Sequence, residues 1–435
     1  MSRDTKNIPD ELLDLLPAYE RIKVALIRQI EANEFPPGSR LPSESELCQM
    51  FGVSRITTSR ALNDLAQWAG IDSAQQALQA INLDVMIFLS AMFVIGRSMQ
   101  ESGYLLYLFN RIFGRARNAD QLVLLILFAM GFLSALLMND TLAIIGTPLM
   151  LYFSRELKIS AKMLLLTLAF AVTIGSAMSP IGNPQNLLIA INSGLSNPFL
   201  VFLQHLMLPT VANLILAYLL LRLFYSGQFE KKQLQIQSGQ IIDPTLARLS
   251  RLSFILLFAL ILAKMAAVLL GIGQDFPLTY IALISALPVL LFSRRRAEVV
   301  RGIDWCTLIF FAAMFVLMDA VWRSGFFQAL LAGSHSDLAT VPAILAFSVV
   351  MSQLVSNVPL VALFQPMLVH PSTEALMALA AGSTIAGNLF ILGAASNVII
   401  IQNAEKSGET ITFLEFAKVG APLTALNILV YWIFL

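Results

Sequence analysis

Apolar residues are distributed very differently in two parts of this chain. Residues 1–69 mix polar, charged and apolar positions, whereas residues 81–435 form long apolar stretches separated by short loops. A helix needs about 20 consecutive apolar residues to cross a bilayer. The pattern therefore predicts a small polar domain at residues 1–69, a linker at residues 70–80 and a membrane domain at residues 81–435.

The polar part predicts three helices. The first runs from about residue 19 to residue 32, where apolar residues recur at helical spacing. Ser43 and Glu46 have the spacing of a capping box, which predicts a short second helix that ends near residue 51. A third helix follows over residues 55–67. Two helices joined by a tight turn are typical of a major-groove reader, and hydroxyls and arginines early in the second helix suit phosphates and guanine edges. The candidate DNA-binding residues are Arg55, Thr57, Thr58 and Arg60.

The apolar part predicts an all-α, polytopic membrane protein. Two further apolar segments, residues 120–153 and 340–369, each carry a polar break and are predicted to be re-entrant hairpins rather than crossings. The eight predicted crossings lie near 83–103, 163–190, 200–223, 252–270, 278–293, 305–322, 376–402 and 418–434.

An internal repeat connects the two halves of the membrane part. Residues 81–104 align without gaps to residues 303–326, with 9 of 24 positions identical. Two further matches follow in the same order, and they pair Asn139 with Asn357 and Asn186 with Asn397. The first repeat covers about residues 81–226 and the second about residues 250–435, a spacing typical of transporters built from two halves.

The placement of positive charge predicts that the repeats are inverted. Lys and Arg mark cytoplasmic loops. Arg111 and Arg115 follow the first repeated helix, so that helix runs from outside to inside, whereas Arg295 and Arg301 precede its counterpart, which runs from inside to outside. The predicted location is the bacterial inner membrane, in a multi-pass arrangement.

Four polar breaks interrupt the apolar stretches, at residues 139–141, 180–186, 356–359 and 393–397. Such breaks are tolerated in a bilayer only where they line a cavity, and half-helix N-termini beside them offer amide donors to an anion. Two breaks are hairpin tips and two divide crossing helices into discontinuous ones. The candidate substrate- or ion-binding residues are Asn139, Asp140, Thr141, Gly182, Asn183, Asn186, Ser356, Asn357, Ser396 and Asn397.

Within these breaks Asp140 is the one acidic residue. An intramembrane carboxylate is a candidate proton carrier or sodium ligand, so the coupling ion is expected to be Na⁺ or H⁺. The alternative reading is that Asp140 caps a hairpin tip, and that the paired asparagines cap backbone groups in structural turns.

Composition narrows the function classes further. The chain is 57% apolar and 13% charged, with mean hydropathy +0.75, against about 25% charged residues in a soluble domain. Its net charge of +1 favours no particular partner, and its two cysteines and three scattered histidines form no metal motif. Because the sequence also contains no P-loop or nucleophile elbow, we expect neither an enzyme nor a resident cofactor.

The run PPGSRLPSESELCQMFGVSRITTSRALNDLAQ resembles the GntR-type winged helix-turn-helix regulators over about residues 17–67. The resemblance implies DNA as a partner, contacted through Arg55, Thr57 and Arg60. This chain departs from that family because the sequence continues into WAGIDSAQQALQAINLD and the membrane part, with no two-stranded wing.

The motifs SPIGNPQN and SNVP resemble the ion transporter superfamily over about residues 80–435, as in arsenite permeases, sodium-dicarboxylate symporters and YbiR-type membrane proteins. The resemblance implies an anion permease or an ion-coupled symporter or antiporter, with an elevator-like movement. It also implies a homodimer.

The two parts conflict. If the first repeated helix runs inward, residue 80 lies outside, where there is no DNA, yet the Lys and Arg residues of the polar domain favour the inside. The second repeat has two spans before its signature helix and the first has none, which indicates that a span was lost. Three readings follow: a secondary transporter, a membrane-tethered GntR-like regulator, or a non-functional gene fusion.

Overall fold

The computed structural model describes residues 16–32, 34–35, 41–68, 74–229, 241–271, 276–331, 340–368 and 370–435. All regular secondary structure in these residues is helical. The chain forms two compact units, one comprising residues 1–81 and 316–327 and the other residues 82–315 and 328–435. One boundary lies between residues 81 and 82, whereas residues 316–327, which the sequence analysis places in the membrane domain, are grouped with the first unit.

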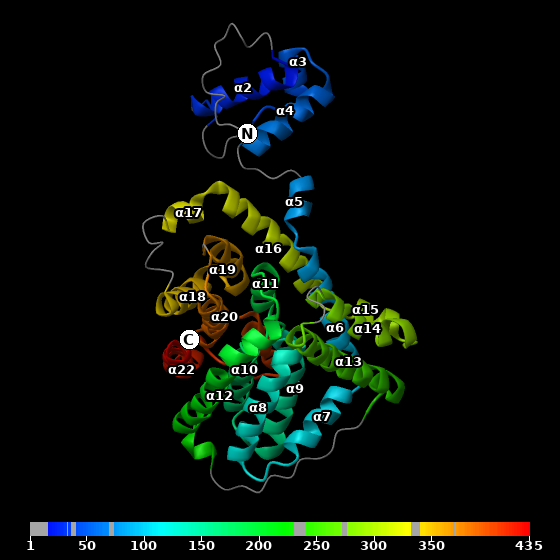
Figure 1. The fold of residues 1–435 in the computed structure, drawn as a ribbon, viewed down its shortest axis with the longest axis vertical. Coiled ribbons are helices and arrows are strands. Elements are labelled where there is room, and N and C mark those ends of the chain that lie inside the picture. The colour runs from blue at the N-terminus through cyan, green and yellow to red at the C-terminus, as the bar shows by residue number, and fades with distance from the viewer. Residues whose placement is uncertain are drawn as a thin grey trace. The chain divides into compact units, whose positions relative to one another are not determined.

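The N-terminal unit contains a three-helix cluster built from α2 (Ala18–Glu31), α3 (Glu44–Phe51) and α4 (Arg55–Trp68), as predicted (Figure 1). The capping box is present, because Ser43 Oγ accepts from the Glu46 amide and the Glu46 carboxylate accepts from the Ser43 amide. Gly52 ends α3 in the left-handed conformation, with φ +63°, which glycine adopts without strain. The core of the cluster consists of Ile22, Leu26, Ile27, Leu47, Ala61 and Leu65. A short helix, α5 (Ala74–Ala80), lies in the predicted linker.

The second unit, which we call the membrane unit and to which we add residues 316–327 because they continue α16, follows the predicted order of crossings and hairpins (Figure 1). In the first repeat the helices are α6 (Leu83–Glu101), α7 (Tyr104–Phe113), α8 (Ala119–Leu137), α9 (Asn139–Leu157), α10 (Ala161–Ser176), α11 (Pro184–Asn192) and α12 (Pro198–Phe224). The second repeat has α13 (Pro244–Leu269), α14 (Leu278–Phe292), α15 (Arg296–Arg301), α16 (Trp305–Ser324), α17 (Phe326–Leu331), α18 (Val341–Val355), α19 (Asn357–Phe364), α20 (Thr373–Ile385), α21 (Ala395–Glu405) and α22 (Phe413–Phe434).

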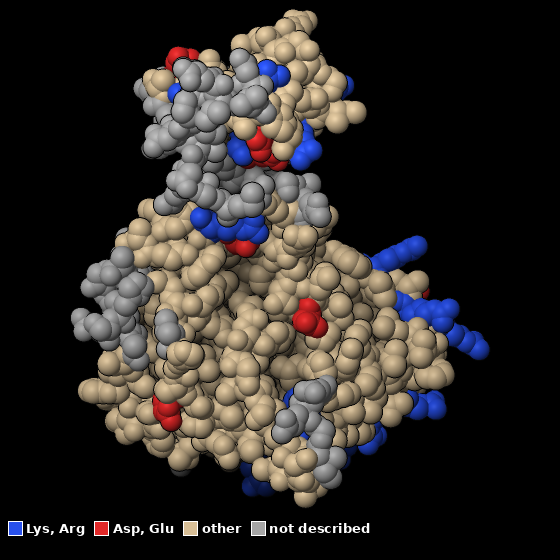
Figure 2. All heavy atoms as spheres, turned by 45° about the horizontal axis from the view of Figure 1, so that its top comes forward, with Lys and Arg blue, Asp and Glu red and all other residues tan. Residues whose placement is uncertain are grey.

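Six of the described helices are long and apolar enough to cross a membrane: α6, α8, α12, α13, α16 and α22. The other predicted crossings are made by the shorter α14 and by the discontinuous pairs α10–α11 and α20–α21. In Figure 2 uncharged atoms cover most of the face of the membrane unit that is in view, and Lys and Arg side chains gather along one edge. Most Lys and Arg side chains therefore lie toward one margin, whereas Asp or Glu side chains also lie within the face in view (Figure 2).

Although α8 is long enough to cross, its contacts show that it belongs to a hairpin with α9. The amide of Asn139, at the turn between these helices, donates to the carbonyl of Gly182 over 3.0 Å. Gly182 lies in the break between α10 and α11, so the hairpin tip reaches the depth at which that crossing is interrupted. The arms lie side by side and α10 packs against both (Figure 1).

The two halves interlock by exchanging contacts between hairpins and broken helices. Helix α9 of the first hairpin packs on α21 of the second broken crossing, and α19 of the second hairpin packs on α11 of the first. Helices α12 and α22, which end the two repeats, pack on each other. This reciprocal packing brings all four polar breaks into one region of the membrane unit.

Candidate functional site

Both hairpin tips adopt the same rare backbone conformation. Met138 has φ 69° and ψ 142°, and its repeat counterpart Ser356 has φ 72° and ψ 163°. Non-glycine residues seldom occupy this region, at a cost of about 1–3 kcal/mol each, and such strain concentrates at ligand clamps. Its recurrence at two matched positions indicates that the sharp tip is a feature both repeats require.

Four helix N-termini converge on one small cavity, which we call the tip cavity. Its volume is about 40 Å³. The first residues of α9, α11 and α19 and the residues on either side of the α21 N-terminus line it. The positive ends of the helix dipoles make such a meeting point favourable for negative charge, although the amides of Asn139 and Asp140 are already engaged by the Gly182 carbonyl and the Asn139 side-chain oxygen. The lining residues are Asn139, Asp140, Pro184, Gln185, Phe310, Phe311, Met314, Ser356, Asn357, Val358, Pro359, Ala394 and Ala395.

Among the described residues, Asp140 is the one carboxylate that lines the tip cavity. Its side chain is 6% exposed and, within the described residues, its carboxylate oxygens make no hydrogen bond. It does not cap the tip, because the Asp140 amide instead donates to the Asn139 side-chain oxygen over 3.0 Å. A buried carboxylate without donors is costly, so this side chain is free for a proton or a cation.

The asparagines of the first broken helix have a structural role. Asn186 is fully buried, and its Nδ2 donates to the carbonyls of Ser176, Ala177 and Ser179, over 3.1–3.3 Å. Its Oδ1 accepts from Thr384 of the second repeat over 3.3 Å. These bonds satisfy carbonyls that the end of α10 would otherwise leave unpaired.

Asn183 completes this buried network. Its Oδ1 accepts from the Asn186 amide over 2.9 Å and so caps α11, while its Nδ2 donates to the hydroxyls of Ser176 and Thr384 over 3.0 and 3.1 Å. Both side chains are occupied by the break itself and neither lines the tip cavity, so a contact of Asn183 or Asn186 with the substrate stays a prediction. The capping alternative describes them correctly.

The second broken helix repeats part of this arrangement. Asn397 donates to the Gly387 carbonyl over 2.6 Å, and Gly387 is the repeat counterpart of Ser176. Its Oδ1 and the hydroxyl of the adjacent Ser396 are buried without partners in the described part of the chain. Neither residue lines the tip cavity, and the Asn397 side chain satisfies a backbone carbonyl that follows α20.

The structure thus divides the ten predicted site residues. Asn139, Asp140, Ser356 and Asn357 line the tip cavity, and the buried Asn357 Oδ1 has no partner among the described residues. Gly182 contributes its carbonyl to the Asn139 amide and no lining surface. Thr141 lines a second cavity instead.

Gln185 lines the tip cavity and was missed by the sequence analysis. It is buried, and its side chain makes no hydrogen bond within the described residues. The signal was present, because Gln185 follows the Asn183 cap and Pro184, which is the first residue of α11. Side chains in the first helical turn lie beside the amides that would contact a ligand.

A second cavity of about 280 Å³ adjoins Asp140, and we call it the α6 cavity. It lies between α6, α9 and the turn from α15 to α16, and Asp140 lines both cavities. It adds a second carboxylate, Asp304, and an arginine, Arg97, which the sequence analysis did not select. Its lining residues are Phe93, Gly96, Arg97, Gln100, Asp140, Thr141, Ile144, Ile145, Gly302, Ile303 and Asp304.

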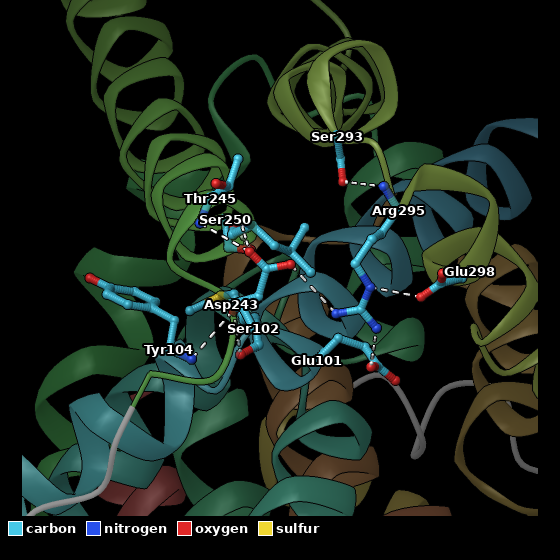
Figure 3. Close-up of polar contacts among 11 residues, drawn as sticks. Glu101, Ser102, Tyr104, Asp243, Thr245, Ser250, Ser293, Arg295 and Glu298 are labelled. Atoms are coloured by element: carbon cyan, nitrogen blue, oxygen red, sulfur yellow. Dashed lines mark hydrogen bonds and ion pairs between the residues drawn. The ribbon is translucent and has the colours of Figure 1, made fainter.

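An ionic network ties the end of α6 to α13, α14 and α15 (Figure 3). Arg295 pairs with Glu298, Glu101 and Asp243 at 2.7, 3.3 and 3.6 Å, and Glu101 also pairs with Arg97 at 2.5 Å. Hydrogen bonds from the amides at the start of α13, together with Arg295, hold the pKa of Asp243 below its ordinary value. The network contains two arginines and three carboxylates, so the positive charge of Arg97 is balanced within the network.

The predicted DNA-binding residues have different exposures. The Arg55 side chain is 83% exposed and pairs with Glu44 at 2.9 Å, a hydrogen bond that lowers the pKa of Glu44. Arg60 is exposed and lies over the Tyr19 ring, while Thr57 is half-buried at the start of α4. Thr58 is fully buried and its hydroxyl lies against the Ser54 carbonyl and Cys48 Sγ. The Thr58 side chain is therefore not exposed in this structure, and its contact with DNA stays a prediction.

Hairpin tips and broken helices that meet at one cavity inside an apolar helical bundle define a secondary membrane transporter. The chain belongs to the Citrate transporter (CitMHS) family, whose sequence model matches residues 52–375. The model of the bacterial regulatory proteins of the gntR family matches residues 18–77. The protein is a multi-pass transporter of the bacterial inner membrane with a GntR-type domain at its N-terminus.

Proteins of similar sequence or structure are also named as transporters. An uncharacterized transporter of Mycobacterium bovis is 29% identical over 373 residues, which cover 82% of this chain and 86% of the relative. The silicon efflux transporter LSI3 of Oryza sativa subsp. japonica is 26% identical, over 81% of this chain and 86% of its own length. The crystal structure of the YdaH transporter from Alcanivorax borkumensis shares the fold, with a TM-score of 0.53 at 17% identity over 85% of this chain and 88% of YdaH.

Proposed function

We propose that this transporter carries a small oxyanion or its conjugate weak acid, bound at the tip cavity. The supporting observation is the convergence of four helix N-termini on that cavity. Their dipoles favour an anion, while the side chains of Asn357 and Gln185 line the cavity and the Asn357 Oδ1 has no partner among the described residues.

The volume of the tip cavity also favours a small oxyacid as the substrate. A cavity of about 40 Å³ is comparable to one water molecule, which occupies roughly 30 Å³ in the liquid. A small oxyacid fits after a modest separation of the two tips, whereas citrate requires a much larger one. The silicon efflux activity named for the rice relative agrees with a small oxyacid substrate.

Asp140 makes binding depend on an accompanying cation. Its negative charge opposes an anion at the same cavity, so neutralisation by a proton or by sodium favours substrate binding. A single carboxylate among four positive helix ends therefore supplies the coupling that a secondary transporter needs.

The test is uptake by the purified full chain in liposomes, with silicic acid, sulfate and citrate as probes. We expect uptake of silicic acid or sulfate, and we expect Asn357→Ala to raise KM roughly 5- to 30-fold through loss of one hydrogen-bonding group. The matched control is Asn192→Ala, because Asn192 is exposed at the end of α11. Uptake of citrate alone, or an unchanged KM in Asn357→Ala, contradicts the proposal.

A second candidate function rests on the intact helix-turn-helix core. Exposed Arg55 and Arg60 on α4 are available to DNA, which supports a membrane-tethered regulator. A gel shift of the detergent-purified chain on its own promoter region tests this function. A protein–DNA complex that dissociates at physiological salt and shows no sequence preference would rule out the regulatory function.

The homodimer implied by the superfamily resemblance stays a prediction. Cross-linking of the full chain in native membranes, followed by denaturing electrophoresis, distinguishes a dimer from a monomer.

A further inference from the structure

The α6 cavity and the tip cavity share one lining residue. Asp140 lies between the two cavities, and its buried carboxylate has no hydrogen-bond partner among the described residues. An ionisable group that is more than nine-tenths buried and exposed only to cavities has no structural role visible in its contacts. Its position points to a ligand that reaches it through the larger space.

Asp304 lines the same cavity from the turn before α16. It is half-buried, and Asp140 lines the same cavity from α9. The cavity is thus lined by a carboxylate with access to water and by one without.

The nearby positive charge does not cancel these carboxylates. Arg97 also lines the cavity, but its guanidinium is engaged by Glu101, which in turn pairs with Arg295 (Figure 3). Gln100 and Thr141 are the remaining polar lining residues, and both are uncharged. The charged groups facing Asp140 are therefore Asp304 and an already paired Arg97, and the cavity favours a positive charge.

We propose that the α6 cavity is the path by which protons reach Asp140 from the cytoplasmic side, with Asp304 as the intermediate carrier. This proposal rests on the proposed substrate site and names its coupling ion. A proton from cytoplasmic water binds Asp304 and moves through cavity water to Asp140, which becomes a neutral acid. The tip cavity then presents four positive helix ends and no negative charge, so the anion binds. While Asp140 keeps its proton, the anion binds and leaves at equilibrium, which permits exchange. Loss of the proton from Asp140 restores the repulsion and lowers the affinity for the anion, which couples net transport to the proton.

The lining chemistry favours a proton over sodium. Both carboxylate oxygens of Asp304 already accept hydrogen bonds, from the Thr307 amide over 2.9 Å and the Thr307 hydroxyl over 2.6 Å. Around Asp140 the cavity wall is mainly apolar, with Phe93, Ile144 and Ile145. Hard cations such as sodium need several oxygen ligands together, whereas a proton needs one carboxylate and water.

The cytoplasmic assignment follows from the predicted topology. Arg97 and Gln100 lie in the last turns of α6, which runs inward, and Asp304 precedes α16, which runs outward. Both helix ends that border the cavity therefore lie on the side marked by Arg295 and Arg301.

The internal repeat provides a matched pair of variants. Asp304 is the repeat counterpart of Asn82, which caps α6 by accepting from the Val85 amide over 3.1 Å. Asparagine caps a helix as well as aspartate does. Asp304→Asn thus keeps the cap of α16 and removes the charge, and Asn82→Asp adds a charge at the equivalent cap of the other repeat.

The experiment compares silicic acid and sulfate transport in liposomes that contain the full chain. Exchange is measured at equal pH on both sides, and accumulation is measured under an imposed pH gradient with sodium replaced by choline. We expect Asp304→Asn to retain exchange and to lose accumulation by about tenfold or more, the usual effect of removing a proton-transfer group. Asn82→Asp should accumulate as the unmodified chain does.

Each outcome decides one question. If the unmodified chain exchanges neither probe, the proposed substrate site fails. If it exchanges a probe and Asp304→Asn accumulates that probe normally, the proton path fails while the site stands. Accumulation that requires sodium and ignores the pH gradient also overturns the proton path.

A labelling experiment tests the path without any transport assay. Cys48→Ser and Cys306→Ser remove both native thiols, and Gln100→Cys places one in the cavity wall. A membrane-impermeant thiol reagent should label it in inverted vesicles and not in intact cells. Labelling from the outer side alone would overturn the assigned direction.

Discussion

Asn427 of α22 donates from Nδ2 to the Oδ1 of Asn213 on α12 across 2.9 Å, deep inside the membrane unit. One turn away along the same contact, the Thr210 hydroxyl lies 2.8 Å from the Tyr431 hydroxyl. Asn427 Oδ1 also accepts from Asn388 in the second broken helix over 3.0 Å. A buried chain of three amides therefore connects the last helix of each repeat to one of the breaks.

The sequence around this contact contains a repeat match that the sequence analysis did not use. TVAN at residues 210–213 and TALN at residues 424–427 place a threonine and an asparagine at the same spacing in the two helices. Spacing by three residues puts both side chains on one helix face. The two helices meet through equivalent faces, which is how inverted repeats pack about a shared axis.

The amide chain predicts that substitutions of Asn427 and Asn213 lower the unfolding free energy by different amounts. Asn427→Leu removes two hydrogen bonds and Asn213→Leu removes one, so the first should lower the unfolding free energy more, at about 1 kcal/mol per bond. Thermal unfolding of the purified chain in detergent measures the difference, with exposed Asn192→Leu as control. Equal effects of the two variants would show that the bonds do not carry the stability.

Asn186 is expected to determine folding rather than substrate affinity. Asn186→Asp keeps the shape but turns a donor toward three carbonyl oxygens into a carboxylate, which costs on the order of 3 kcal/mol or more. We expect a large fall in purified yield and thermal midpoint. Asn192→Asp makes the same chemical change at an exposed position and should be neutral. A stable Asn186→Asp protein with altered KM would return Asn186 to the substrate site.

The polar breaks could be located from sequence because polar residues inside apolar stretches are conspicuous. What each side chain does could not be derived, because that depends on partners far away in the chain. Asn186 and Asn357 look alike in sequence, yet Asn186 is occupied by carbonyls seven to ten residues back and by Thr384, while Asn357 has an unpartnered oxygen. The sequence analysis did not choose Asp304 as a site residue because it lies at the start of a helix, where an aspartate commonly acts as a cap.

Asp243 predicts an acid-sensitive step in stability. The amides of Leu246 and Thr245, and Arg295, hold its folded-state pKa below the ordinary value of 3.8. A depressed carboxylate pKa contributes stability that is present above the unfolded-state value and is lost as pH falls through the folded-state value. Thermal midpoints should therefore decline below about pH 4 in the unmodified chain.

Asp243→Asn separates this charge from the helix cap. Asparagine still accepts the amides of α13, so the variant keeps the cap but loses the ion pair with Arg295 at 3.6 Å. Its midpoint should be slightly lower near pH 7, and the decline below pH 4 should be smaller than in the unmodified chain. Identical pH profiles would show that other carboxylates govern acid stability.

Arg55 and Thr58 should differ in their effects on DNA binding. Arg55 is exposed, so Arg55→Ala removes one phosphate contact and lowers the salt slope of binding to random-sequence duplex by about 0.9. Thr58 is buried, so Thr58→Val should destabilise the domain by about 1 kcal/mol and leave the salt slope unchanged. An altered slope in Thr58→Val, with the fold intact, would place its hydroxyl on DNA after all.

The position of the N-terminal domain decides how the two parts of the chain can work together. Helix α6 packs on α13 and α14, the two spans that precede its repeat counterpart α16. The repeat predicts an equivalent pair of spans before α6, but the GntR match reaches residue 77 and α6 begins at Leu83, which leaves no room for a span between them. With α6 running inward, residues 1–80 are expected outside.

Protease treatment of intact cells and inverted vesicles, both containing the chain with an N-terminal tag, measures the location of residues 1–80 directly. Cleavage in intact cells supports the predicted topology and excludes gene regulation by this chain, because no DNA is present on that side. Cleavage only in inverted vesicles, with Gln100→Cys still labelled from the cytoplasmic side, would show that the domain is cytoplasmic despite the charge pattern and would make regulation compatible with transport.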